Sequence, residues 1–279
     1  MAKPSGVTLG AQSVSHVFKH FGLFANIAVL WSAVVTLAVG VTSMVIASSE
    51  GSSLSSVMMR MEDGDLLRQY LIVTGIASTF GQLAAAVSWS RYILLKETPQ
   101  LSFSLPKGSA RYLARSLILL FGAVALAIPG FIVGAIVGGL APSDAGKVAA
   151  AIVMGIGALI AVYICIRAWL VFPAVSIGSD MGFRESFRLT KGFTASIVVG
   201  SIIAYGVFIL LAAIPASVIS LAFGDLDGSL YIAAVLVSEF LSTFLIYGAV
   251  AASAGVLARI FAHVVPAAEA HPEQIAAFE

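Results

Sequence analysis

Long apolar runs alternate with short polar segments along the whole chain. A helix needs about 20 mostly apolar residues to cross the hydrocarbon core of a bilayer. Six runs meet this length, and we place the corresponding helices at residues 24–47, 70–95, 113–140, 148–172, 194–223 and 230–262. The pattern therefore predicts an all-α fold, in which a polytopic membrane protein crosses the bilayer with six transmembrane helices.

Composition supports the bilayer as the solvent for most of this chain. Of the 279 residues, 59% are hydrophobic and only 10% are charged, whereas a soluble domain is typically about 25% charged. The first apolar run is longer than the roughly 7–15-residue core of a signal peptide, so we expect a retained helix. We expect three parts: an amphipathic N-terminal segment (1–23), the six-helix transmembrane domain (24–262) and a C-terminal tail (263–279).

Lysine and arginine residues are distributed unevenly between the two sides of these spans. Twelve of the 15 lie in segments on the N-terminal side, and the remaining three are Arg60, Arg68 and Lys147. Cytoplasmic segments carry an excess of Lys and Arg, so we expect both termini in the cytoplasm. The net charge of +1 does not indicate a nucleic-acid partner.

The segment 173–192 is unusually rich in charge for its position between two apolar runs. We expect Pro173 to end the fourth span. After it, Phe183 and Phe187 share one face of a short helix, and three cations share a neighbouring face: Arg184, Arg188 and Lys191. A helix of this kind lies in the membrane interface, with its rings in the acyl boundary and its cations among lipid phosphates.

Two further segments on the same side have a similar amphipathic pattern. Before the third span, Arg111 and Arg115 follow Lys107 at four-residue steps. Before the first span, an apolar face follows the i, i+3, i+4, i+7 rule with Val14, Val17, Phe18 and Phe21. These segments predict partners at the cytoplasmic face, namely anionic lipid headgroups or a membrane-protein partner. A basic loop that only fixes the topology is the alternative.

Spans three and five contain similar sequences, LAIPGFIVGAIVGG and LAAIPASVISLAFG. Pro129 and Pro215 each stand nine residues before a glycine in these stretches, which indicates a parallel repeat of helical hairpins. Each proline removes one backbone donor and is expected to kink its helix. Gly130, Gly134 and Gly138 lie at four-residue steps, which favours close helix approach either within the bundle or in self-association.

The polar residues inside the spans are the candidates for intramembrane chemistry. Glu239 is the one acidic residue within a predicted span, with Ser238 and Ser242 beside it and Gln82 in the second span. Ionisable groups inside a bilayer are costly and often functional. These residues favour either a proton or cation site or a set of hydrogen bonds that fixes helix packing.

Other kinds of chemistry leave little trace in the sequence. The chain has no phosphate-binding glycine loop, no nucleophile elbow and no zinc-protease motif, so we predict no catalytic residue, no metal and no cofactor. The pattern favours a non-enzymatic integral membrane protein, a scaffold, assembly or envelope-maintenance factor that acts through lipid or partner contacts. The alternative is a small permease or channel that uses Glu239 and the kinked spans three and five.

The stretch IRAWLVFPAVSIGSDMGFRESFRLTKG resembles a segment of a family of six-span bacterial inner-membrane proteins, which includes the membrane domain of some glycerophosphodiester phosphodiesterases. In that family an arginine near a helix end precedes a Pro-Ala step, and a Ser-x-x-Leu-Thr-x-Gly sequence opens the next helix. The resemblance implies six-span architecture and no catalysis in these 279 residues; an acidic residue expected after the Pro-Ala step is absent. The matching positions are Arg167, Pro173, Ala174, Ser186, Leu189, Thr190 and Gly192.

Overall fold

The computed structural model describes residues 4–50, 64–140, 143–223 and 229–265, and these residues form an all-helical fold, as predicted. Six helices are long and apolar enough to cross a membrane: α2 (Phe21–Glu50), α4 (Gly64–Leu95), α5 (Ser109–Leu140), α6 (Asp144–Ala168), α9 (Thr194–Phe223) and α10 (Ser229–Val264). The described residues also include three shorter helices: α1 (Gly6–Lys19), α7 (Val171–Ser176) and α8 (Phe183–Leu189). Most of the predicted C-terminal tail, from residue 266, lies outside the described residues, as does Arg60.

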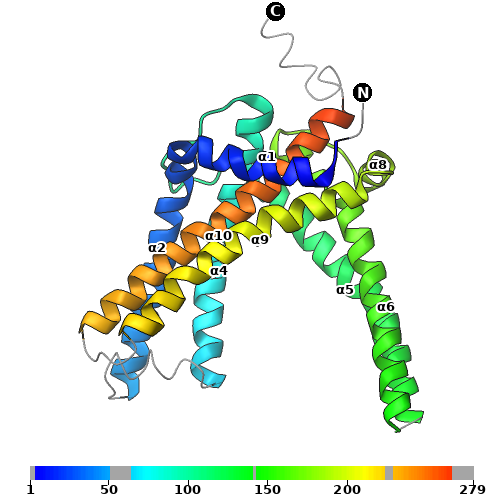
Figure 1. Ribbon diagram of the computed structural model, residues 1–279, viewed down its shortest axis with the longest axis horizontal. Coiled ribbons are helices and arrows are strands. Elements are labelled where there is room, and N and C mark those ends of the chain that lie inside the picture. Colours follow the sequence, from blue (N-terminus) through cyan, green and yellow to red (C-terminus); the bar gives the residue numbers. More distant parts are fainter. Residues whose placement is uncertain (1–3, 51–63, 141–142, 224–228, 266–279) are drawn as a thin grey trace, which may run out of the picture.

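The long helices pair into the three antiparallel hairpins expected from the sequence, α2–α4, α5–α6 and α9–α10. Helices α2, α4, α9 and α10 form one bundle, and the α5–α6 hairpin forms a separate arm that diverges from it (Figure 1). The bundle and the arm meet at the end where α1, α7 and α8 lie. We call this the basic end, and define it as residues 4–20, 91–115, 167–194 and 259–265.

The α5–α6 arm is covered by apolar side chains on almost all sides. Its two helices contact mainly each other, and they reach the rest of the protein through α7, α8 and the neighbouring ends of α4 and α9. Phe121, Leu140 and Leu159 are 68%, 81% and 70% exposed on it. Because helices satisfy their own backbone hydrogen bonds, such a surface is stable in contact with lipid chains.

Small residues bring the two helices of this arm close together. A Cβ atom added to Gly130 would lie 2.8 Å from the Cα of Gly157, and one on Gly138 would lie 3.3 Å from the Cβ of Ala150. Gly134 faces Ala150 in the same way, with 3.0 Å between the added Cβ and the carbonyl oxygen. Of the two roles that the sequence left open for these glycines, the structure shows packing between helices of the same chain, α5 and α6.

The expectation that Pro173 ends the fourth span is wrong. The helix breaks earlier, because α6 ends at Ala168 and α7 begins at Val171, so Pro173 lies in the first turn of α7. A proline is tolerated there because its missing N–H would have no partner within the helix. Pro129 and Pro215 lie inside the continuous helices α5 and α9, and their kinks remain a prediction.

Helix α1 packs across α9 and α10 at the basic end (Figure 1). Of the apolar face predicted for it, Val17 is buried, but Phe18 and Phe21 are 47% and 50% exposed. Exposed rings are compatible with the interfacial helix that the sequence predicts. The contact with the bundle also uses small residues, which hydrophobic spacing does not reveal. The buried residues of α1 are Gly6, Leu9, Gly10, Ser13 and Val17.

Two glycines allow α1 to cross α9 at close range. A Cβ on Gly6 would lie 2.9 Å from the carbonyl oxygen of Ser196, and a Cβ on Gly10 would lie 2.9 Å from that of Gly200. The hydroxyl of Ser196 also donates a hydrogen bond to the carbonyl of Pro4 at 3.1 Å. The N-terminal helix is therefore an integral part of the bundle as well as an interfacial helix.

An aromatic cluster joins α1 to the end of α4. The ring of His16 lies 4.5 Å from that of His20 and stacks on Tyr92 at 5.7 Å. The Tyr92 hydroxyl is 3.1 Å from Nδ1 of His20. Burial, reinforced by the nearby positive charge of Arg259, lowers the pKa of His16 from 6.5 to about 4. His16 is therefore neutral at pH 7 and packs as an uncharged ring.

We predict that Gly130→Ala destabilises the α5–α6 arm, because the added methyl group meets the backbone of Gly157. Overpacking of this kind costs about 1–3 kcal/mol, measured as a lower Tm in detergent. Gly122→Ala is the matched control on α5, since a Cβ there meets nothing within 4 Å. Equal Tm values for the two variants would contradict this account of the arm.

Acid should weaken the docking of α1 through His16. Its pKa in the folded protein is about 4, below the ordinary 6.5, so the unfolded chain takes up the proton first as the pH falls. The stabilisation is complete above pH 6.5 and is lost progressively between about pH 6.5 and pH 4. We expect Tm to fall across this window and His16→Gln to flatten the profile. A His16→Gln protein with the unchanged pH profile would contradict the assignment.

Candidate functional site

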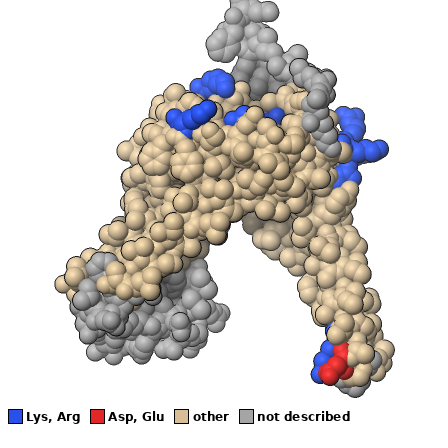
Figure 2. All heavy atoms as spheres, viewed as in Figure 1, with Lys and Arg blue, Asp and Glu red and all other residues tan. Residues whose placement is uncertain are grey.

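Positive charge gathers at the basic end (Figure 2). All five cations predicted to contact lipid or a partner lie there. Lys147, by contrast, is at the far tip of the α5–α6 arm, with its Nζ 3.1 Å from the Asp144 carboxylate. The cations that the sequence assigns to one side of the spans thus also lie at one end of the folded protein. The assignment of this end to the cytoplasm stays a prediction.

Hydrogen bonds among residues 166–192, the segment that resembles the six-span family, hold α8 against the end of α6. The backbone carbonyl of Arg167 accepts hydrogen bonds from Ser186 Oγ at 2.9 Å and Thr190 Oγ1 at 3.0 Å. Its guanidinium donates to the carbonyl of Phe187 and lies over the Phe187 ring, 5.2 Å from the centroid. Arg167 therefore has a structural role here, and the serine and threonine serve the same junction.

The structure brings together two cation groups that are about 70 residues apart in sequence. The guanidinium of Arg115 on α5 lies over the ring of Phe183 on α8, 5.3 Å from its centroid. Arg111 lies 3.4 Å from Asp180, in the turn just before α8. We call the resulting patch the α5–α8 cationic surface, and define it as Arg111, Arg115, Arg184, Arg188 and Lys191.

The cations of this surface are weakly neutralised within the protein. The side chain of Arg188 is 79% exposed, and its ion pair with Glu185 is long, at 3.9 Å. The Arg111–Asp180 pair is more exposed still, with side chains 68% and 95% accessible. Exposed pairs of this kind contribute little free energy, so these arginines remain available to an outside anion.

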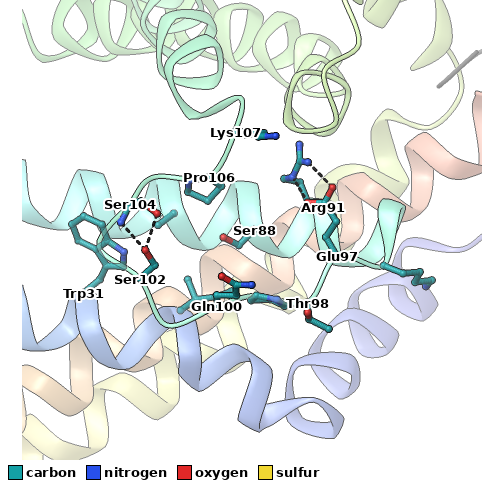
Figure 3. Close-up of a pocket in the computed structure, with 14 residues that line it drawn as sticks. Trp31, Ser88, Arg91, Glu97, Thr98, Gln100, Ser102, Ser104, Pro106 and Lys107 are labelled. Atoms are coloured by element: carbon teal, nitrogen blue, oxygen red, sulfur yellow. Dashed lines mark hydrogen bonds and ion pairs between the residues drawn. The ribbon is translucent and has the colours of Figure 1, made fainter. Parts of the chain in front are cut away.

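The sequence pattern did not predict a second cationic site, which the structure shows. A cavity of about 630 Å³ lies between α2, α4 and the segment that follows α4 (Figure 3). Arg91 is one of its walls: Nε and Nη2 donate to the Glu97 carboxylate at 2.7 and 2.6 Å, and Nη1 donates to the carbonyl of Ser176 at 2.7 Å. Since Ser176 belongs to α7, Arg91 also ties the bundle to the segment that leads to the arm.

A neighbouring cavity of about 550 Å³ shares three wall residues with the first: Arg91, Glu97 and Lys107. We call the two cavities together the vestibule. Lys107 is exposed and forms no ion pair among the described residues. The segment that follows α4 begins at Lys96. Among the described residues other than glycine, Lys96 alone has a positive φ, of 60°.

The wall of the vestibule formed by residues 100–106, which we call the strap, is a non-helical segment in which polar and apolar residues alternate. Gln100, Ser102 and Ser104 line the cavity, and the two serine hydroxyls lie 2.7 Å apart. The intervening residues are apolar and exposed: Leu101 (61%), Phe103 (66%) and Leu105 (37%). The signal was visible in the sequence as QLSFSL, a period of two residues.

Glu239 lies half-buried on α10, away from the basic end. Its carboxylate accepts a hydrogen bond from Thr243 Oγ1 at 3.4 Å. Glu239, Thr243 and Tyr247 follow one another at four-residue steps and so share a face of the helix. Near the middle of α10 this face meets α4, where Tyr247 packs against Gly81. A column of polar groups therefore runs along α10, and Tyr247 brings one end of it to the contact with α4.

The other predicted intramembrane residues are held by different partners. Ser242 Oγ donates to the carbonyl of Ala212 at 3.0 Å and so joins α10 to α9. Gln82 is exposed on α4, and its Nε2 donates to Ser78 Oγ at 3.1 Å. Ser238 is buried. The Ser242 bond thus joins two helices, whereas the Gln82 bond stays within α4. Glu239 does not line the vestibule or the hollow beside Arg184 and Arg188.

Comparison of the chain with protein-family models, with curated proteins and with solved structures finds no match. Six long apolar helices, with their cations gathered at one end, make this chain a multi-pass membrane protein.

Proposed function

We propose that the protein is a non-enzymatic component of the bacterial inner membrane that holds anionic lipid headgroups at the cytoplasmic leaflet, as a scaffold, assembly or envelope-maintenance factor. The observation that carries this proposal is the α5–α8 cationic surface. Cations from two separate segments converge there through the Arg115–Phe183 contact. Their acidic neighbours are too exposed to neutralise them.

The position of this surface suits a lipid partner. It lies where the α5–α6 arm joins the rest of the protein, next to the exposed apolar side chains of α5 and α6. Each Lys or Arg near an anionic membrane surface contributes on the order of 1 kcal/mol. Four or five such residues on one surface would hold a small patch of anionic headgroups, and the aromatic ring of Phe183 would lie in the acyl boundary.

A partner protein would use the same features in another way. The arm diverges from the bundle, so a membrane protein with an apolar surface would find contacts on two groups of helices. This reading predicts that a protein, in addition to lipid, stays bound to the chain in native membranes. Purification in native lipid therefore reports on both forms of the proposal.

The pair Arg184→Ala and Arg188→Ala should weaken retention of anionic lipid about tenfold, because two exposed cations are lost from one surface. The measurement is the ratio of phosphatidylglycerol to phosphatidylethanolamine that copurifies, determined by mass spectrometry. Lys147→Ala is the matched control, because this exposed cation lies at the opposite tip of the arm. An unchanged lipid ratio in the double variant would leave these arginines as topology determinants only.

A small permease or channel is the second candidate function, and the column of Glu239, Thr243 and Tyr247 favours it. It has less support, because the cavities described above are lined by other residues. We expect liposomes that contain the protein to show no pH-driven cation flux above empty liposomes, and Glu239→Gln to change nothing. Flux in the unsubstituted protein that Glu239→Gln abolishes and Ser238→Ala preserves would establish the permease instead.

A further inference from the structure

We propose that the vestibule is a binding site for a phosphate ester with a partly apolar organic group. Both phospholipid headgroups and soluble phosphorylated compounds have this chemistry. The site borders the α5–α8 cationic surface and shares Arg111 with it, but its main walls are the strap, Arg91 and Lys107, whereas lipid retention is tested at Arg184 and Arg188 on α8. Each can therefore fail without the other.

The strap places polar groups where the surroundings are apolar. Leu101, Phe103 and Leu105 are exposed on its outer side, and an exposed row of this kind is stable in the membrane interface. Its other side presents Gln100, Ser102 and Ser104 to the cavity. The strap thus lines an open cavity with polar side chains, while its apolar side chains lie outside the lining.

The walls of the first cavity have a net positive charge. Its lining includes the cations Arg91, Lys96 and Lys107 against one carboxylate, that of Glu97. The second cavity adds Arg111 to the same side. An anion is therefore the favoured occupant, and at headgroup depth in a bilayer the abundant anions are phosphate esters.

The arrangement of the walls suggests how such a molecule would lie. Arg91 and Lys107 stand at one end of the cavity, and Trp31 stands at the other, beside Ser102 and Ser104 (Figure 3). The side chains of Ile27 and Ala84 add to the apolar part of the lining. A phosphate at the cationic end would leave the organic group against Trp31, with the serine hydroxyls within its reach.

Arg91 is prepared for this role by its neighbours. The Glu97 carboxylate and the Ser176 carbonyl occupy three of its five N–H groups and hold the guanidinium in place. Its side chain is 13% exposed, so little freedom is lost when a ligand binds. Lys107 is exposed in comparison, and it supplies a charge that is not already paired within the described residues. The volume, about 630 Å³, lies within the usual range for small-molecule sites.

Trp31 provides a reporter in the wall of the site. The full-length protein in a neutral detergent would be titrated with short-chain phosphatidylglycerol, and the Trp31 emission followed, with Trp31→Phe to identify its signal. We expect a saturable change with phosphatidylglycerol and a much weaker one with phosphatidylcholine, whose choline cation offsets the phosphate. Lys107→Met should raise the apparent Kd about fivefold to tenfold, while Arg184→Ala with Arg188→Ala should leave it unchanged.

A second variant acts in the opposite direction. Glu97→Gln removes the one carboxylate among the lining residues without changing its shape, and it should lower the apparent Kd several-fold. Competition by millimolar glycerol phosphate would identify a soluble phosphate ester as the ligand class; its failure to compete would identify the lipid. The proposal is overturned if Lys107→Met and Glu97→Gln leave Kd unchanged at unaltered Tm, if phosphatidylcholine binds equally well, or if the Arg184 and Arg188 variant accounts for the whole signal.

Discussion

The hydrocarbon core of a bilayer offers no hydrogen-bond partners, and this constraint shapes the whole protein. Each span must satisfy its own backbone, so the six long segments are helices and the polar connections lie at their ends. Close contacts between helices then depend on small residues, as at Gly130 with Gly157 and at Gly10 with Gly200. At the basic end a polar contact joins the bundle to α7, the segment that leads to the arm, where Arg91 reaches Ser176.

Apolar run length was enough to predict the fold class and the hairpins, because a span is a local property of the sequence. The third span was predicted over 113–140 and is Ser109–Leu140; its start extends further because the segment around Arg111 continues the same helix. One contact was not predicted and one local expectation failed, both for tertiary reasons. Hydrophobic spacing did not reveal that α1 is buried through Gly6 and Gly10, and Pro173 joined a new helix, since its environment includes α4 and α10 as well as its own segment.

The candidate sites were predictable to different degrees. Charge counting found the cations of the α5–α8 cationic surface, yet it could not show that Arg115 meets Phe183 across two helices. The vestibule was missed because a cavity exists only after α2, α4 and the strap are assembled. The alternation of Leu101 and Phe103 with Ser102 and Ser104 was readable in advance, but six residues between two spans resemble an ordinary polar loop.

The two polar regions of the protein differ in what their surroundings allow. Glu239 has a hydroxyl partner on its own helix and lies half-buried on α10, so a charge there gains little from the protein around it. At the basic end, cations outnumber carboxylates, cavities are open, and Arg91 is held by two neighbours while part of its hydrogen-bonding capacity remains free. Binding energy comes from groups that are fixed in place but not yet satisfied. By that criterion the vestibule, more than the intramembrane carboxylate, is where this membrane protein is built to meet a ligand.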